Sequence, residues 1–192
     1  MDRELVAVWV GPRKDPSLRF GGRAKAPVPT RTISTRTLAE RRMDITWLTE
    51  RIAVGGGIWN SENMGKVARE GITHVIDMQI EFDDTSLAQL HEIEVLWNPI
   101  DDDFQPKPPV VFQRGVDFAA EALKEDGTKL FIHCAAGVHR APMMALAVLC
   151  ASGWMPETAR ELIEKRRPVV DFADVYVRSV ERFLDQQVKA GE

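Results

Sequence analysis

The sequence predicts an α/β fold of three layers, in which a central, largely parallel sheet lies between two layers of helices. Two observations lead to this prediction. Short apolar runs alternate with amphipathic helical patterns from residue 43 onwards. The stretch Met143–Ala151 is apolar on every side, as is typical of a helix buried in a core. We expect one domain over residues 43–192, preceded by a separate segment, residues 1–42.

The first half of this domain is expected to contain four strands and two helices. Asn60 or Ser61 can cap a helix that ends before Gly71. A second, short helix is expected through Leu87 and Leu90. Apolar runs bounded by turn residues predict the strands, at 45–48, 52–54, 72–78 and 94–100.

The second half is expected to contain one more strand and four helices. Residues 101–109, DDDFQPKPP, are too rich in aspartate and proline for regular structure. The apolar face from Phe112 to Leu123 predicts a helix that Gly127 ends. A buried strand at 130–133 then leads through a short loop into the all-apolar helix. Two amphipathic helices follow, at about 157–167 and 173–188.

Composition excludes several classes of protein. The chain is 44% hydrophobic and 28% charged, which is ordinary for a soluble globular domain. No apolar run approaches the roughly 18 to 20 residues needed to cross a bilayer, and the first residues do not resemble a secretory signal. Two cysteines cannot form a disulfide framework or a four-cysteine zinc site. We therefore expect a cytoplasmic protein without a membrane span.

Charge is distributed unevenly along the chain. Residues 1–42 carry a balance of +6, and residues 43–192 carry −10. The acidic domain offers no broad footprint for nucleic acid, so we expect no nucleic-acid partner. The basic segment is rich in Gly, Pro, Ser and Thr and lacks a hydrophobic period, which favours a flexible chain. It is interpreted either as a solvated tail or as an arm that docks on an acidic partner.

The residues with chemical potential lie between the buried strand and the buried helix, in LFIHCAAGVHRAPMM. A loop at this point can turn its backbone N–H groups inward and form an anion site beside a helix N-terminus. Such a site favours the thiolate of Cys134, and Arg140 can hold two phosphate oxygens. The pattern predicts phosphoryl transfer onto Cys134. The expected phosphate-binding residues are Ala135, Ala136, Gly137, Val138, His139 and Arg140.

Phosphoryl transfer to a thiolate also needs a group that protonates the leaving oxygen. The loop after the strand at 94–100 offers three carboxylic acids for this role, Asp101, Asp102 and Asp103. The second cysteine, Cys150, lies in the all-apolar stretch and is interpreted as a core residue, with a redox partner for Cys134 as the alternative.

HCAAGVHR fits the signature HCxxGxxR, and the chain thereby resembles the cysteine-dependent protein tyrosine phosphatases. The surrounding order of residues 43–184, including GITHVIDM and the late RRP at 166–168, resembles the dual-specificity branch. The resemblance implies that Cys134 is the nucleophile and that His133 orders the loop. Related phosphatases carry the acid in a Pro-apolar-x-Asp pattern, which Pro99 and Ile100 match and which selects Asp102.

The chain departs from the family pattern at two positions. Ala141 stands where the family usually has Ser or Thr, whose hydroxyl helps the thiolate leave. Plant glucan phosphatases resemble this chain in having Arg-Ala-Pro at this point and are active. His139 stands where many relatives have a small residue, and a similar His occurs in a branch that acts on inositol pyrophosphates. If His139 points into the pocket, it adds positive charge for polyanionic substrates, and if it points outward, it has no special role.

Together these features predict a phosphomonoester hydrolase, most simply a dual-specificity phosphatase acting on phosphotyrosine and on phosphoserine or phosphothreonine in proteins. Two alternatives stay open. One is a phosphatase of a phosphoglucan, a phosphoinositide or an inositol phosphate, and the other is a pseudophosphatase that only binds phosphorylated ligands. We expect no cofactor, and no metal, because the four histidines lack ligand spacing. The sequence does not define the oligomeric state.

Overall fold

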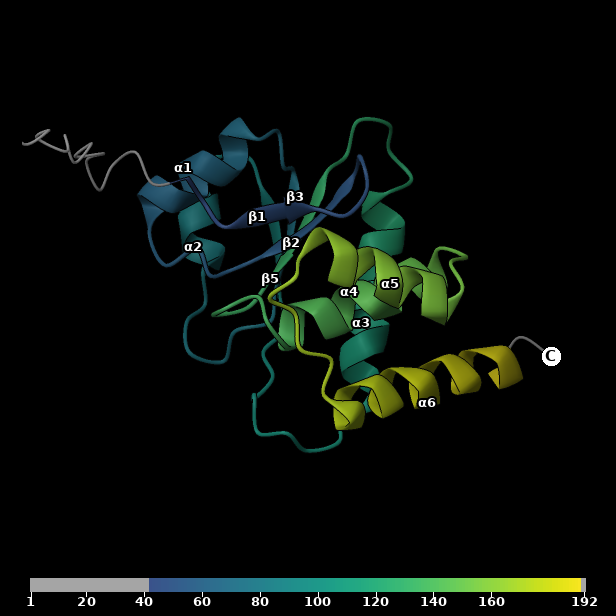
Figure 1. Ribbon diagram of the computed structural model, residues 1–192. Coiled ribbons are helices and arrows are strands. Elements are labelled where there is room, and N and C mark those ends of the chain that lie inside the picture. The colour runs from purple at the N-terminus through teal and green to yellow at the C-terminus, as the bar shows by residue number, and fades with distance from the viewer. Residues whose placement is uncertain (1–41, 191–192) are drawn as a thin grey trace, which may run out of the picture. The chain divides into compact units, whose positions relative to one another are not determined.

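The computed structural model describes residues 42–190, which form one five-stranded sheet with helices on both faces (Figure 1). The elements follow one another as β1 (Ile45–Trp47), β2 (Ile52–Gly55), α1 (Ser61–Arg69), β3 (His74–Asp77), α2 (Thr85–Ala88), β4 (Glu94–Trp97), α3 (Pro109–Ala122), β5 (Leu130–His133), α4 (Arg140–Ala151), α5 (Pro156–Arg166) and α6 (Asp174–Ala190).

The sheet has the order β1-β2-β5-β3-β4 and is parallel except at one edge. Strands β2, β5, β3 and β4 run in the same direction, and β1 pairs with β2 in the antiparallel sense. Gly55, His133 and Asp77 are neighbours in register at the ends of β2, β5 and β3. The carboxyl ends of the central strands therefore meet at one edge of the sheet, where ligands bind in open α/β folds.

Helices cover the two faces of the sheet unequally. In Figure 1, α1 and α2 lie on one side and α3 to α6 on the other. Each face has its own buried core: Val75 and Phe131 belong to the smaller one, against α1 and α2, and Ile76 and Ile132 to the larger one. Alternate residues of one strand thus face different layers. The predicted three-layer fold is confirmed.

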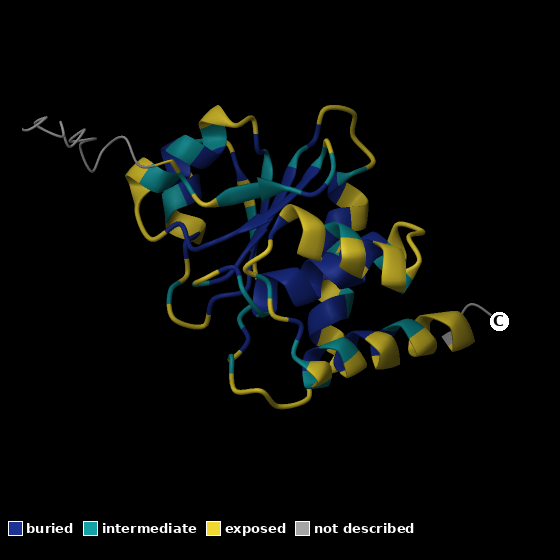
Figure 2. Ribbon diagram, in the orientation of Figure 1, coloured by how far each residue is buried: buried dark blue, intermediate teal, exposed yellow. Residues whose placement is uncertain are grey.

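Helix α4 occupies the centre of the larger layer. All its residues from Arg140 to Leu149 are buried, and it appears dark blue throughout this stretch in Figure 2. It contacts α3, α5, α6 and the sheet. The all-apolar sequence predicted this position, and the same packing fixes the point at which β5 turns into α4.

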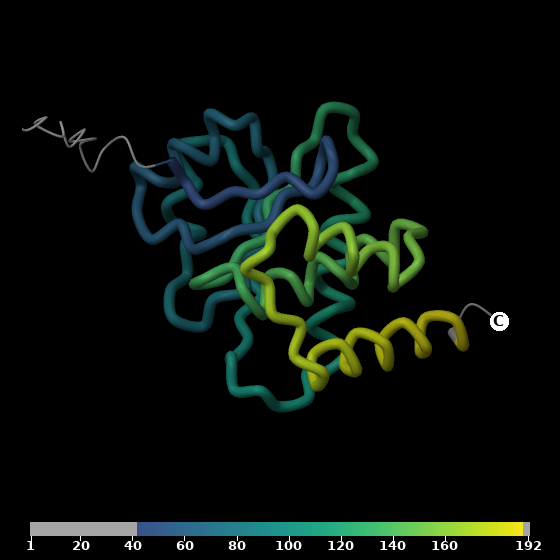
Figure 3. The backbone as a smooth tube through the Cα atoms, in the orientation of Figure 1, coloured from purple at the N-terminus to yellow at the C-terminus, as the bar shows by residue number. Residues whose placement is uncertain are grey.

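Several boundaries differ from the sequence-based predictions. The strand predicted at 94–100 ends at Trp97, because the buried Asn98 side chain binds the Val111 carbonyl and Pro99 has no N–H to donate. The strand predicted at 72–78 covers only 74–77, and the short helix ends at Ala88, before Leu90. Residues 98–108 have no regular structure. This agrees with the prediction for 101–109 except at Pro109, which begins α3. Figure 3 shows this segment reaching the first turn of α6.

The prediction of a flexible basic segment concerns residues 1–42, of which all but Arg42 lie outside the described residues. Within residues 42–190, none of the helices has the length and hydrophobicity that a bilayer crossing demands.

Candidate active site

Cys134 directly follows β5 at the carboxyl edge of the sheet, and its residue is almost fully buried. The loop after it curls back, so that the Gly137 N–H donates to the Cys134 Sγ over 3.3 Å. Gly137 has φ +65°, and a Cβ at this position would lie 2.5 Å from the Gly55 carbonyl carbon. The tight approach to β2 and the left-handed backbone both require glycine here.

Arg167, at the end of α5, holds this loop from outside. Its Nε donates to the Gly137 carbonyl over 2.8 Å, and its Nη2 donates to the Ala136 carbonyl over 3.2 Å. The same guanidinium forms a two-pronged pair with Asp44, with N–O distances of 2.8 and 2.6 Å, and donates to Thr46. Arg167 therefore ties the loop to the edge strand β1.

The other two loop carbonyls also bind groups outside the loop. The Ala135 carbonyl accepts from the Gly57 N–H, and the Val138 carbonyl accepts from the Asp171 N–H, both over 3.1 Å. In a planar trans peptide, the C=O and the following N–H point in opposite directions. The N–H groups of residues 136–139 consequently face the inside of the loop, where the Cys134 sulfur lies. Inward-facing N–H groups are the geometry that the anion site expected from the sequence requires.

Arg140 is the first residue of α4, and its guanidinium is buried below the loop. Its Nη1 and Nη2 donate to the two carboxylate oxygens of Glu81 over 2.9 and 2.8 Å, and Nη1 also donates to the Ile100 carbonyl. The Nε–H, which has no partner among the described residues, and the second Nη2 hydrogen are left as a fork of two parallel donors. Such a fork matches two oxygens of a phosphate.

The charges around Arg140 fix its ionisation. Burial by itself would lower the pKa of the Arg140 guanidinium, but hydrogen bonding to Glu81 and the negative charges of Cys134 and Asp102 outweigh burial and raise it. The hydrogen bond from Arg140 in turn lowers the pKa of Glu81. The pair is therefore a fixed ion pair that orients the guanidinium.

Of the three candidate acids, the structure brings Asp102 to the loop. Its Oδ2 lies 3.0 Å from the His139 Nδ1 and 3.7 Å from the Arg140 Nε, and its Oδ1 accepts from the Tyr176 hydroxyl over 2.9 Å. The carboxyl group thus lies beside the free edge of Arg140, where the leaving oxygen of a bound ester would be.

The two neighbouring acids have other partners. Asp103 forms an ion pair with the buried Lys107, and this hydrogen bond lowers the pKa of Asp103. Asp101 is exposed and contributes its carbonyl, which accepts from the Lys107 Nζ over 2.7 Å. Lys107 therefore anchors the residues on both sides of Asp102.

His139 is held between two carboxylates. Besides the contact of its Nδ1 with Asp102, its Nε2 lies 3.6 Å from the Asp171 Oδ2, and the edge of its ring meets Phe104. Both ring nitrogens therefore lie near carboxylate oxygens of the protein. This arrangement favours an interaction with the acid over a direct contact with the substrate phosphate.

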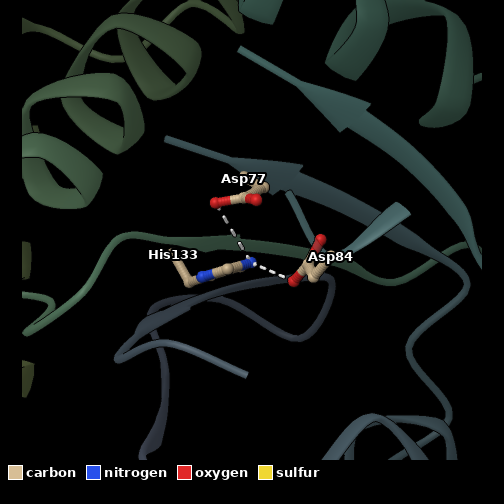
Figure 4. A group of neighbouring side chains, drawn as sticks. All are labelled: Asp77, Asp84 and His133. Atoms are coloured by element: carbon tan, nitrogen blue, oxygen red, sulfur yellow. Dashed lines mark ion pairs between the residues drawn. The ribbon is translucent and has the colours of Figure 1, made fainter. Parts of the chain in front are cut away.

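His133 lies behind the nucleophile, on the opposite face of the sheet. Figure 4 shows its ring between Asp77 of β3 and Asp84, which precedes α2. The His133 Nε2 is 3.0 Å from the Asp84 Oδ2 and 3.7 Å from the Asp77 Oδ1, and all three side chains are fully buried. Burial, together with the charge of Asp84, raises the pKa of Asp77 to about 7, although His133 acts in the other direction.

This cluster brings three groups of the kinds that bind metals within 4.8 Å of one another, which the sequence spacing did not indicate. Two buried carboxylates beside one imidazole also suit a single shared proton. A proton on Asp77, whose pKa is raised, removes one of the two buried carboxylate charges, and the His133 Nε2 lies 3.0 Å from the other carboxylate, Asp84.

Cys150 is unsuited to the redox role that was left open for it. It lies ten residues after Arg140 along α4, or about 15 Å along the helix axis. Burial raises the pKa of the Cys150 thiol to about 11, so the thiolate is scarce at neutral pH. The interpretation as a core residue is the one that this position supports.

Several partners of the site carry no signal in the sequence, among them Asp77, Glu81, Asp84, Arg167 and Tyr176. Arg167 belongs to the RRP motif, which does not show what its side chain binds, and the short motif IEFDD around Glu81 gives no indication of chemistry. Their positions depend on contacts between segments far apart in the sequence.

Comparisons with known proteins agree with this geometry. The model of the dual specificity phosphatase catalytic domain matches residues 59–186. Dual specificity protein phosphatase 5 of Rattus norvegicus is 28% identical over 116 residues, and its counterpart from Homo sapiens is 25% identical. The matched region covers 60% of this chain and only 29% of either relative.

Solved structures show the same fold. The structure of PTPMT1 in complex with PI(5)P superposes with a TM-score of 0.69 at 19% identity, covering 77% of this chain and 99% of that one. Human DUSP28 gives a TM-score of 0.63 at 15% identity, covering 74% and 94%. A cysteine and an arginine at the two ends of a loop between a central strand and a buried helix define the class of cysteine-dependent phosphatases. Within that class, the chain belongs to the dual specificity phosphatase catalytic domain family.

Proposed function

We propose that this chain hydrolyses phosphomonoesters through a phosphocysteine intermediate on Cys134, and that its substrates are phosphorylated proteins. One observation carries the proposal. The Cys134 sulfur, the inward N–H groups of residues 136–139, the free donor fork of Arg140 and the Asp102 carboxyl converge on one place. These are the parts that transfer of a phosphoryl group to a thiolate needs.

The first step forms the intermediate. The Cys134 thiolate attacks phosphorus, and the bond from phosphorus to the ester oxygen breaks. Asp102 donates its proton to that oxygen, so the alcohol or phenol leaves neutral. The loop N–H groups and Arg140 hold the three remaining phosphate oxygens, whose charge spreads in the transition state.

The second step releases phosphate. Asp102, now ionised, takes a proton from a water molecule whose oxygen attacks phosphorus. The sulfur–phosphorus bond breaks and the thiolate of Cys134 returns. Ala141, which follows Arg140 in α4, carries no hydroxyl to assist this departure, and its side chain is fully buried. We infer that the second step limits the turnover of good substrates.

Ion pairing around the loop supports a protein substrate over a polyphosphorylated one. Arg140 is paired with Glu81, Arg167 with Asp44, and Lys107 with Asp103. The exposed carboxylate of Asp171 lies close to His139. A substrate with several clustered phosphates would meet these carboxylates, whereas a lone phosphate can occupy the loop. Inositol phosphates with several clustered phosphates are disfavoured for this reason, whereas a phosphoglucan or a phosphoinositide with a single phosphomonoester stays an alternative.

A substrate panel tests the proposal. We expect purified protein to hydrolyse phosphotyrosine and phosphoserine peptides faster than inositol hexakisphosphate, vesicles containing phosphatidylinositol phosphate, or phosphoglucan. Cys134→Ser should abolish release of phosphate while retaining peptide binding, because the loop and Arg140 remain. Hydrolysis by that variant would contradict the covalent mechanism. Binding without turnover by the unchanged protein would show a module that only captures phosphorylated ligands.

A further inference from the structure

The hydroxyl of Tyr176 joins the candidate acid to the C-terminal helix. Tyr176 lies in the first turn of α6 and is 1% exposed. Its hydroxyl oxygen is 2.9 Å from the Asp102 Oδ1 and 3.0 Å from the Phe104 nitrogen. Figure 3 shows the segment of residues 98–108 passing beside the start of α6. One side chain thus contacts the loop at two points.

The direction of these two hydrogen bonds is determined by chemistry. A backbone N–H can only donate, so the hydroxyl oxygen accepts from Phe104. The single hydroxyl hydrogen is then directed to the Asp102 Oδ1. Burial raises the pKa of the Tyr176 phenol to about 12, so this hydrogen stays in place over the whole neutral range.

The Asp102 Oδ1 is consequently an acceptor, which favours Oδ2 as the oxygen that carries a proton of Asp102. The His139 Nδ1 beside Oδ2 is compatible with this arrangement when the ring hydrogen is on Nε2. It is Oδ2 that faces the site, 3.7 Å from the Arg140 Nε and 3.0 Å from the His139 Nδ1. We propose that Tyr176 is a positioning residue, which selects Oδ2 as the proton-donating oxygen of Asp102 and directs it towards the leaving group. This inference rests on the proposed function.

The backbone of Phe104 supports this role. Phe104 has φ +55°, an unfavourable conformation for a residue with a bulky side chain. Its N–H bond to Tyr176 and the stacking of the two rings, with centroids 5.7 Å apart and planes at 12°, hold it there. The hydroxyl and the ring of Tyr176 therefore both restrain the turn that follows Asp102.

A second contact with α6 provides a matched control. The hydroxyl of Ser179, one turn further along the helix, accepts from the Lys107 N–H over 3.0 Å. Ser179→Ala removes a hydrogen bond between the same loop and the same helix without affecting a partner of Asp102. Tyr176→Phe keeps the stacked ring and removes only the hydroxyl.

The experiment compares two substrates in each variant. We expect Tyr176→Phe to lower kcat roughly tenfold on a phosphoserine peptide, whose leaving group needs a proton, with KM unchanged. In the burst phase with an activated aryl phosphate, which reports the first step alone, the change should be less than threefold. Ser179→Ala should not alter the ratio of the two rates. Because the ratio is taken within one preparation, a loss of folded protein cancels.

A double variant completes the test. In Asp102→Asn the proton is already lost, so adding Tyr176→Phe should cause no further fall on the phosphoserine peptide. Equal losses on both substrates, an unchanged rate, or losses that multiply in the double variant would overturn the inference. If the unchanged protein hydrolyses neither substrate, both the proposed function and this inference are refuted. If the unchanged protein hydrolyses the phosphoserine peptide and Tyr176→Phe does so at the same rate, only the positioning role of Tyr176 is refuted and the proposed function stands.

Discussion

Replacing Asp77 by asparagine tests the shared proton behind the nucleophile. Asp77 is fully buried, and its pKa is raised from 3.8 to about 7, chiefly by burial. The Asp77 Oδ1 accepts from the Gln79 N–H over 2.8 Å, and the carbonyl of an asparagine can accept the same bond. The substitution therefore copies the protonated form of Asp77 and removes only its ability to ionise.

The sign and size of the effect follow from proton binding. Between pH 3.8 and about 7, the folded protein keeps the Asp77 proton and the unfolded chain loses it, so stability falls as the pH rises. Above pH 7 the whole penalty is present. At 1.36 kcal/mol for each pKa unit, the penalty reaches roughly 4 kcal/mol. Asp77→Asn cannot ionise at this position and does not incur the penalty. The difference in free energy of unfolding between the variant and the unchanged protein should therefore grow in favour of the variant by this amount between pH 4 and pH 8.

Urea unfolding at several pH values measures the difference. The variant and the unchanged protein should have similar free energies of unfolding near pH 4, and the variant should be the more stable at pH 8. Asp126→Asn, which changes an exposed carboxylate, should follow the unchanged protein at every pH. A gap that does not depend on pH, or a variant that loses stability as the pH rises, would refute the shared-proton reasoning.

Three more predictions concern the candidate active site. Asp102→Asn should slow hydrolysis of esters with poor leaving groups by roughly 10²-fold and hardly affect the burst rate of an activated aryl phosphate, which reports the first step alone; equal losses would assign Asp102 a structural role. Ala141→Ser should raise the steady rate by at most about tenfold and leave the burst of phenol in rapid mixing unchanged; a native protein without a burst would contradict this. Arg167→Met should lower the free energy of unfolding by roughly 2 to 3 kcal/mol and reduce kcat/KM, because the loop loses its contacts with Arg167. Arg166→Met, a change at an exposed neighbour, should do neither. Equal effects of the two substitutions would contradict the role of Arg167 in holding the loop.

The layer architecture and the phosphate loop could be predicted because their signals are local. The apolar stretch Met143–Ala151 has no polar face, so it can only be buried, and the strand before Cys134 must then lie beside it. Gly137 and Arg140 follow Cys134 within one loop, where spacing along the chain nearly equals spacing in space. Choosing Asp102 among three adjacent acids needed the family pattern as well, because the residue types alone do not distinguish them.

The remaining contacts were decided only by the tertiary structure. Glu81 and Arg140 are 59 residues apart, Arg167 and Asp44 are 123 apart, and Tyr176 and Asp102 are 74 apart. Each pair meets because the sheet order brings its elements to one edge, and no periodicity in the sequence records that order. The sequence by itself determined which residues can perform the chemistry. The packing of α5, α6 and β3 around the loop decided which other side chains hold these residues in place, because a hydrogen-bond partner is selected by distance in the folded chain.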